Sequence, residues 1–238
     1  MHTNNDLKVV YFPSCINRSM GKNSFQGSDD LQLTDLTHKL LQRAGFEIIY
    51  PESIDNHCCG MPFSSKGFND ANQNQSDHLE LALLSASENG KYPILYDMSP
   101  CFYHSKEEFS KKLKIVDPIE FMLDFVLPQL AIKSKKDIVT IYPVCSVKKI
   151  GKTDQLLELA NHCAEKVVMI DSNCCGFAGD RGFLIPELTQ HGLRDLKQQI
   201  PTNCTNGYST SRTCEIGLEK MSGIDFKSIF YLLDEVTS

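Results

Sequence analysis

The strongest constraint on the fold is an internal repeat built around cysteine. An early phrase, Tyr11-Phe12-Pro13-Ser14-Cys15, returns near the middle of the chain as Ile141-Tyr142-Pro143-Val144-Cys145. A second phrase, Cys58-Cys59-Gly60, returns in the same order as Cys174-Cys175-Gly176. Two phrases that recur in one order predict two related halves, because coincidence rarely preserves order. We place these halves at residues 1–132 and 133–238, with a polar connection at residues 131–136.

A further cysteine completes each half. Cys101 follows the Cys-Cys-Gly phrase of the first half, whereas Cys204 and Cys214 both follow that of the second. Spacing favours Cys214, and so does local context, because Cys101 and Cys214 both come after a polar loop at the expected start of a helix. Cys204 is interpreted as a structural residue at a strand end. Cys163, inside a helical pattern, is interpreted as a core residue.

Short apolar runs alternate with amphipathic stretches along the chain, which is typical of α/β units with parallel sheets. The predicted fold is therefore α/β, with two α/β units related by a pseudo-twofold axis and carrying small parallel sheets. Expected strands are Lys8–Phe12, Phe46–Tyr50, Pro93–Tyr96, Ile138–Tyr142 and Val167–Ile170. Expected helices lie near residues 31–41, 79–84, 118–126, 153–163, 186–199, 214–221 and 226–233.

Composition excludes several classes of protein. The chain has 238 residues, 41% of them hydrophobic and 23% charged, as in ordinary soluble domains. Its net charge of -6 gives no basic footprint for nucleic acid. No apolar run approaches the length of a membrane span, and the polar start does not resemble a signal peptide. We expect a cytoplasmic protein, at most peripheral on the inner face of the membrane.

Ten cysteines are many for a chain without a secretion signal. In a reducing compartment they indicate metal ligands, redox thiols or buried apolar residues rather than disulfides. Loops that leave the carboxyl ends of parallel strands gather at one edge of a sheet, so the thiols of one half could converge. Adjacent cysteines are unusual for zinc but could reach two metals of one cluster from a turn. The glycine that follows permits a positive φ there.

The repeated phrases resemble the cysteine-rich CCG domain family. Its tandem form occurs in heterodisulfide reductases, in glycolate oxidase iron–sulfur subunits and in lactate-utilisation proteins. Residues 142–151, 174–183 and 207–215 are similar to the C-terminal region of FAD and iron–sulfur D-lactate dehydrogenases. The resemblance implies a CCG domain in each half, with an iron–sulfur cluster of 4Fe-4S type. The implied ligands are Cys15, Cys58, Cys59 and Cys101 in the first half and Cys145, Cys174, Cys175 and Cys214 in the second.

The function implied by this resemblance is electron transfer within a flavin-dependent 2-hydroxy-acid dehydrogenase of D-lactate or glycolate type. FAD would belong to a partner domain or subunit, and the electrons would pass to a quinone or a cytochrome. Heterodisulfide reductases carry Cys-x-x-Cys at the last position of each half, whereas this chain has single cysteines there. That departure weakens a disulfide-reductase interpretation, which stays an alternative. A second alternative is a zinc-stabilised assembly domain without a redox role, and zinc in one site is also compatible with the pattern.

Polar residues near the third cysteines could contact such a cofactor. Ser99, Ser211 and Arg212 are candidates for hydrogen bonds to cluster sulfur, although a serine there could simply cap a helix. Arg181 could balance the charge of a cluster or pair with the neighbouring Asp180. His57 and His162 lie near cysteines and are interpreted as surface residues or supports rather than ligands.

Overall fold

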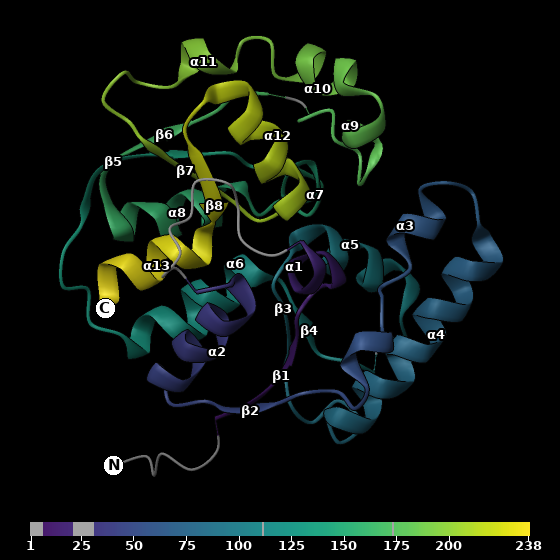
Figure 1. Ribbon diagram of the computed structural model, residues 1–238. Coiled ribbons are helices and arrows are strands. Elements are labelled where there is room, and N and C mark those ends of the chain that lie inside the picture. Colours follow the sequence, from purple (N-terminus) through teal and green to yellow (C-terminus); the bar gives the residue numbers. More distant parts are fainter. Residues whose placement is uncertain (1–6, 21–30, 111, 173) are drawn as a thin grey trace. The chain divides into compact units, whose positions relative to one another are not determined.

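The computed structural model describes residues 7–20, 31–110, 112–172 and 174–238 (Figure 1). Its described residues form two compact units: residues 7–20 and 37–130 belong to unit 1, and residues 31–36 and 131–238 belong to unit 2. Each unit contains a four-stranded sheet in which every pairing is parallel. The predicted α/β class with two small parallel sheets is therefore confirmed.

The sheet of unit 1 has the strand order β2-β1-β3-β4. Its strands are β1 (Lys8–Phe12), β2 (Glu47–Ile49), β3 (Ile94–Tyr96) and β4 (Ile115–Val116). Val10 in the central strand β1 pairs with Ile49 on one side and Ile94 on the other. Because β1 and β3 have neighbours on both sides and are covered by helices, they are apolar runs with almost no exposed side chain.

The helices of unit 1 include one long element, α4, which runs for 18 residues. They are α1 (Cys15–Ser19), α2 (Leu33–Arg43), α3 (Met61–Ser64), α4 (Asn69–Ala86), α5 (Ser99–Glu108) and α6 (Pro118–Phe121), with the 3-10 helices η1 (Ile54–Asn56) and η3 (Leu127–Gln129) and the π-helix η2 (Met122–Val126). Helix α2, which begins among the residues of unit 2, ends as the sequence predicts. Gly45 adopts φ +84° and Phe46 N–H donates to Leu41 O, a typical glycine-terminated helix end.

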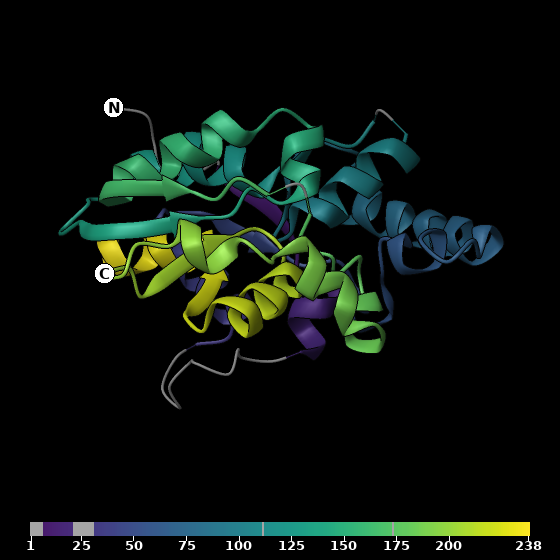
Figure 2. The same ribbon diagram turned by 90° about the horizontal axis from the view of Figure 1, so that it is seen from above.

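Unit 2 repeats the strand order of unit 1, as β6-β5-β7-β8. Its strands are β5 (Lys136–Ile141), β6 (Ala164–Met169), β7 (Asn206–Ser209) and β8 (Asp225–Ser228). Figure 2 shows β5 and β6 running side by side in the same direction, with Val139 paired to Val167. The strand that precedes the first cysteine is thus central in both sheets, which places that cysteine at the middle of a carboxyl edge.

Unit 2 differs from unit 1 in having a series of short helices between its second and third strands. The helices are α7 (Cys145–Lys149), α8 (Thr153–Cys163), α9 (Arg181–Leu184), α10 (Pro186–Gly192), α11 (Leu196–Gln199), α12 (Arg212–Ser222) and α13 (Ile229–Thr237). Helix α8 packs on β5, β6 and α13, whereas α12 packs on β7 and β8. The core of the unit is consequently formed by the apolar strand residues and the buried stripes of these three helices.

Three local predictions were wrong. The expected helix at residues 226–233 begins only at Ile229, because Asp225–Ser228 forms an edge strand with alternating burial. The expected helix at residues 186–199 breaks after Gly192, which packs against Cys174 O too closely for any side chain. Cys204 precedes β7 instead of ending a strand. The short strands β4, β7 and β8 were missed altogether, because two to four residues give too little periodicity to recognise.

None of the helices in the described part of the chain is both long and apolar enough to cross a membrane.

Candidate metal centre

The first cysteine of each half begins a short helix directly beyond the central strand. Cys15 opens α1 three residues after the end of β1, and Cys145 opens α7 four residues after the end of β5. The residue before each cysteine is extended, and the cysteine itself starts the helical turn. Both thiols therefore lie at the carboxyl edge of their sheet, where loops of parallel α/β units form binding sites.

The Cys-Cys-Gly phrases form turns whose backbone points at sulfur. Gly60 and Gly176 adopt φ +89° and +72°, which matches the expected need for glycine. Gly60 N–H donates to Cys58 Sγ at 3.5 Å, and Gly176 N–H donates to Cys174 Sγ at 3.3 Å. A Cβ at Gly60 would lie 2.5 Å from Asn72 Oδ1, and one at Gly176 would lie 2.1 Å from Leu188 O. Neighbouring protein atoms thus leave no space for a side chain at either glycine.

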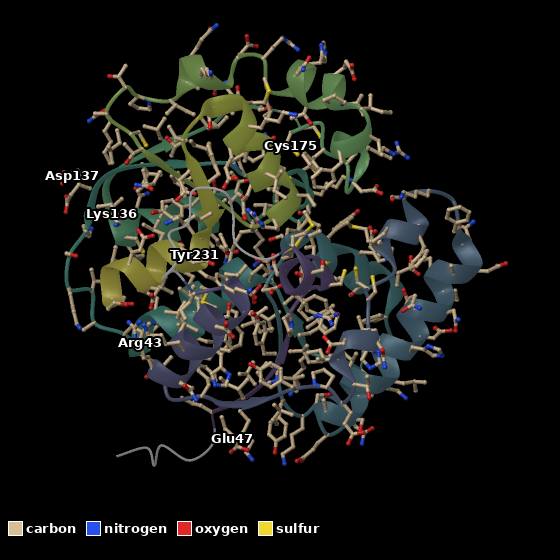
Figure 3. The ribbon with its side chains drawn as sticks, viewed as in Figure 1. Arg43, Glu47, Lys136, Asp137, Cys175 and Tyr231 are labelled. Carbon is tan, nitrogen blue, oxygen red and sulfur yellow. The ribbon has the colours of Figure 1, made fainter. Side chains whose placement is uncertain are left out.

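The last cysteines, Cys101 and Cys214, occupy the third positions of α5 and α12. Cys175 Sγ lies 3.1 Å from Cys214 Sγ, beside α12 in Figure 3. In unit 1, the Cys101 side chain lies close enough to Cys59 to raise the pKa of the Cys59 thiol. The predicted proximity of Cys214 to the Cys-Cys-Gly turn is therefore present.

The thiols of each half form a continuous series of sulfur contacts. Cys15 Sγ lies 3.8 Å from Cys58 Sγ, and Cys58 in turn contacts Cys59. Unit 2 has the corresponding contacts from Cys145 to Cys174 and from Cys174 to Cys175. The structure thus brings together, within each unit, the four cysteines that the sequence pattern groups.

Two cysteines, Cys204 and Cys163, have contacts other than those of these series. Cys204 Sγ lies 3.2 Å from Thr140 Oγ1 and 3.3 Å from Asn206 O, within the sheet of unit 2. Cys163 is fully buried at the end of α8. Burial raises the pKa of the Cys163 thiol to about 12, so this side chain stays protonated and apolar at neutral pH.

One thiol in each series has a lowered pKa and would lose its proton before the others. Hydrogen bonds from Cys15 and Cys59 lower the pKa of Cys58, helped by the Gly60 N–H and the charge of Arg18. Hydrogen bonds from Cys145 and Cys175 lower the pKa of Cys174 in the same way. The pKa of Cys15 and that of Cys145 are raised, chiefly because each donates to its partner and is partly buried. Metal binding would release these remaining protons.

The arrangement of sulfur atoms bears on which metal group fits. Among the residues described, no three His, Cys, Asp or Glu side chains converge on a point where a single metal ion could bind. Four thiols linked as a series, one of which receives a glycine N–H in each unit, suit a larger inorganic core that carries several metals. A lone zinc ion requires four ligands around one point.

The polar residues proposed from sequence have other contacts. Ser99 Oγ donates to Asp117 Oδ2 at 3.2 Å, and Ser211 Oγ lies 3.5 Å from Thr213 Oγ1. Arg212 pairs with Glu215 at 3.7 Å, while its Nε is buried without a hydrogen-bond partner. That orphan donor, two residues before Cys214, fits a group bound beside the cysteine.

The remaining residues considered from sequence are Arg181 and two histidines, and none of them is fully buried. Arg181 begins α9 directly after the second Cys-Cys-Gly turn. The His57 ring contacts Glu52 O at 3.1 Å and is half-buried, whereas His162 is exposed.

Sequence reasoning missed a set of residues that hold the thiols in place. Asp97 is buried and accepts hydrogen bonds from Ser14 N–H, Ser14 Oγ and Tyr11 Oη at 2.9, 2.6 and 3.0 Å. Ser76 Oγ donates to Cys59 O at 3.1 Å. The sequence gives one hint of this set, because Ser14, which binds Asp97, directly precedes a repeated cysteine. Nothing in the sequence points to Ser76.

Two basic residues were also missed, although the repeat contains a signal for them. Arg18 and Lys148 each come three residues after the first cysteine of their half. Arg18 Nη2 donates to His57 O at 2.7 Å, and Lys148 Nζ donates to Ser172 O. Comparison of the two halves position by position could have found them.

The sequence model of the family described as cysteine-rich domain (CCG) matches residues 9–105. This range contains the first, second and third cysteine segments of unit 1. Over residues 9–105 the chain is therefore similar to the cysteine-rich CCG domain. Residues 131–238, which form most of unit 2, lie outside the matched range, so their assignment to the same family is a proposal.

Curated relatives include a subunit of the anaerobic glycerol-3-phosphate dehydrogenase of Escherichia coli K12 and its counterpart from Escherichia coli O157:H7. Each is 26% identical over 138 residues, which is 53% of this chain and 35% of the relative. The chain thus spans about a third of the length of the curated relatives it matches.

Among solved structures, glutamate racemase from Aquifex pyrophilus matches with a TM-score of 0.41 and 14% identity, covering 96% of this chain and 81% of that one. An aspartate racemase from Picrophilus torridus matches with a TM-score of 0.40 and 9% identity, covering 97% and 93%. TM-scores this low support no conclusion about shared fold or activity.

Proposed function

We propose that the chain is an iron–sulfur electron-transfer module of a dehydrogenase, with one cluster site in each unit. The observation that carries this proposal is the series of four thiols at the carboxyl edge of each sheet. The CCG match and the dehydrogenase subunit among the relatives support it. Unit 2 is proposed as a second CCG domain because it repeats the strand order and the cysteine placement of unit 1.

The residues of the chain would bind the cluster and shield it. When bound, an iron–sulfur cluster accepts and releases single electrons. Cys59, Cys101, Cys175 and Cys214 are buried and would supply the inner thiolates. Cys145 and Cys174 are exposed and would bind at the solvent side. The Gly60 and Gly176 N–H groups would donate to the thiolates and stabilise their negative charge.

Substrate oxidation would take place on a partner. We propose a flavin-containing dehydrogenase domain or subunit as the electron donor and a quinone or cytochrome as the acceptor. The resemblance of the second half favours a 2-hydroxy acid such as D-lactate or glycolate as the substrate. The relatives are named for glycerol 3-phosphate, and both kinds of substrate are anionic alcohols.

Anaerobic reconstitution with ferrous iron and sulfide tests the proposal. The wild-type protein should bind iron and acid-labile sulfide and show absorption near 400 nm that dithionite bleaches. Cys175→Ser and Cys214→Ser should each lower the iron content, whereas Cys204→Ser and Cys163→Ser should retain it. A colourless protein that binds stoichiometric zinc would instead support the assembly-domain alternative. Full iron content in Cys214→Ser would show that the ligand set is wrong.

A disulfide-reductase function is the second candidate, because Cys175 Sγ and Cys214 Sγ are only 3.1 Å apart. In that reaction the two thiols would become a disulfide while a substrate disulfide gains two electrons and two protons. Reduction of a disulfide substrate by the metal-free protein, abolished in Cys214→Ser, would favour this candidate.

A further inference from the structure

Two basic side chains occupy the same place in the two units. Arg18 lies on α1 and Lys148 lies on α7, each one helical turn beyond the first cysteine. Their side chains extend toward the segment that leads into the Cys-Cys-Gly turn of the same unit. These contacts join parts of the chain that are 39 and 24 residues apart in the two units.

The contacts of Arg18 connect three segments around the thiols of unit 1. Its Nη2 donates to His57 O at 2.7 Å, directly before Cys58. Its Nε donates to Pro13 O at 3.2 Å, two residues before Cys15. Its Nη1 pairs with Asp55 at 3.0 Å, and the side chain is only 14% exposed. The rigid planar guanidinium thus holds the approaches to both cysteines at once.

Lys148 makes the corresponding contact in unit 2 with a simpler group. Its Nζ donates to the carbonyl oxygen of Ser172, two residues before Cys174. A lysine ammonium can point its charge at one carbonyl but cannot form the planar fork of an arginine. The link between the first-cysteine helix and the Cys-Cys-Gly turn is therefore present in both units, with more contacts in unit 1.

We propose that Arg18 and Lys148 are positioning residues that hold the Cys-Cys-Gly turn against the first-cysteine helix. They would keep the first and second thiols of each unit within reach of one another before any metal binds. The consequence for cluster assembly rests on the proposed function, whereas the positioning itself is a property of the metal-free chain.

The charge of these residues adds to their geometry. Thiolates that approach one another repel, so a nearby cation makes their assembly less unfavourable. A hydrogen bond between an ionised donor and a carbonyl is also stronger than a neutral one, which suits a link that spans two loops.

Disulfide trapping in the reduced, metal-free, full-length protein tests this proposal. Diamide removes two electrons and two protons from a pair of neighbouring thiols as their disulfide forms, and peptide mass spectrometry identifies the pair. Arg18→Met should lower the yield of the Cys15–Cys58 disulfide by about tenfold, as loss of a hydrogen bond to a charged group would. It should leave the Cys145–Cys174 and Cys175–Cys214 yields unchanged. Lys148→Met should lower only the Cys145–Cys174 yield.

Matched variants distinguish positioning from a general loss of charge or fold. Lys39→Met on α2 and Lys166→Met on β6 remove exposed charges of the same sign and should leave all yields unchanged. Arg18→Lys should restore part of the Cys15–Cys58 yield, because Lys148 makes the same link in unit 2. Circular dichroism identifies any variant that fails to fold. If Arg18→Met does not fold, Arg18→Lys replaces it in the comparison with the wild-type protein.

Two outcomes would overturn the proposal. One is an unchanged Cys15–Cys58 yield in folded Arg18→Met, and the other is an equal loss of every disulfide, as general destabilisation would produce. The test needs no iron, so its result is separate from that of the reconstitution. A wild-type protein that binds no iron, yet shows the expected trapping pattern, would refute the proposed function and leave the positioning role intact.

Discussion

In unit 1 the Cys-Cys-Gly turn rests on two side chains and one backbone oxygen of the long helix α4, whereas in unit 2 it rests on backbone atoms of the short helix α10. Ser76 Oγ donates to Cys59 O, and Asn72 Oδ1, which accepts from His104 Nε2 at 2.8 Å, faces Gly60. In unit 2 the atom nearest to the position that a Cβ of residue 176 would take is the carbonyl oxygen of Leu188. Side chains can move aside more easily than backbone, so the second turn should tolerate less change.

The buried charges differ as well. Unit 1 has the buried carboxylate of Asp97 behind its first cysteine. Unit 2 has Arg212, Glu215 and Glu219 buried together beside its last cysteine. At the position of Glu215, one residue beyond the last cysteine, unit 1 has Phe102. The placement of the thiols therefore follows from the shared topology, while the surrounding charges follow from each sequence separately.

The largest difference between the units should come from replacing the glycines of the two turns. Gly176→Ala places a methyl group 2.1 Å from a backbone oxygen, and Gly60→Ala places one 2.5 Å from a side-chain oxygen, both at positive φ. We expect Gly176→Ala to lower the free energy of unfolding more, and to remove iron from unit 2. Urea denaturation and iron analysis measure these effects.

Gly67 and Gly151 supply the controls. Both have positive φ but open space where a methyl group would lie, so their alanine variants should cost only about 1–2 kcal/mol from backbone conformation. Equal stability of Gly176→Ala and Gly151→Ala would contradict the tight contact at Leu188.

The stability of unit 2 should depend on pH through Glu215. Burial raises the pKa of Glu215 to about 7 despite the neighbouring Arg212. Between the unfolded value of 4.5 and about 7, the folded state keeps a proton that the unfolded state has lost. Stability should therefore fall as pH rises through this window, by up to about 3 kcal/mol. Glu215→Gln should flatten the slope measured by urea denaturation from pH 4.5 to 7.5, and an unchanged slope would exclude Glu215 as its source.

In unit 1, replacing the buried carboxylate should loosen the first cysteine. Three hydrogen-bond donors now point at the Asp97 carboxylate, and Asp97→Asn would replace one of its acceptor oxygens by an amide donor. The substitution should lower the free energy of unfolding by about 1–3 kcal/mol. Hydrogen exchange should rise at Ser14 and in α1 and stay unchanged in α7. Exchange that rises equally in both helices would show that Asp97 stabilises the whole chain and not this loop.

The repeat predicted the parts of the structure that depend on chain order. Cysteines placed after central parallel strands, glycines at positive φ and the choice of Cys214 over Cys204 as the nearer thiol all follow from position in the sequence. Asp97, Ser76 and the acceptors of Arg18 and Lys148 could not be predicted, because each contact joins segments that only the fold brings together. Short edge strands such as β8 were missed because Asp225–Ser228 has too few residues to show a period.

The smallest expected difference concerns ion pairs that tie the central strands to their neighbours. In unit 1, Glu47 pairs with Lys8 at 2.8 Å, but its side chain is 62% exposed. In unit 2, Glu235 accepts from Lys136 at 2.7 Å and from Tyr208 Oη at 3.0 Å, and Lys227 lies 3.5 Å away. Figure 3 marks Glu47 at β2 and Lys136 at the start of β5. Glu235 is 25% exposed, so its network is less screened by water than the pair at Glu47.

Glu235→Gln should therefore lower the free energy of unfolding by about 1 kcal/mol, because three partners lose a charged acceptor. Glu47→Gln should cause no measurable change, since exposed pairs contribute little. Urea denaturation at low and at high salt measures both variants, and salt should reduce the effect at Glu235 without removing it. If the two variants lost equal stability, the network around Glu235 would be no stronger than a single surface pair, and the units would not differ in this respect.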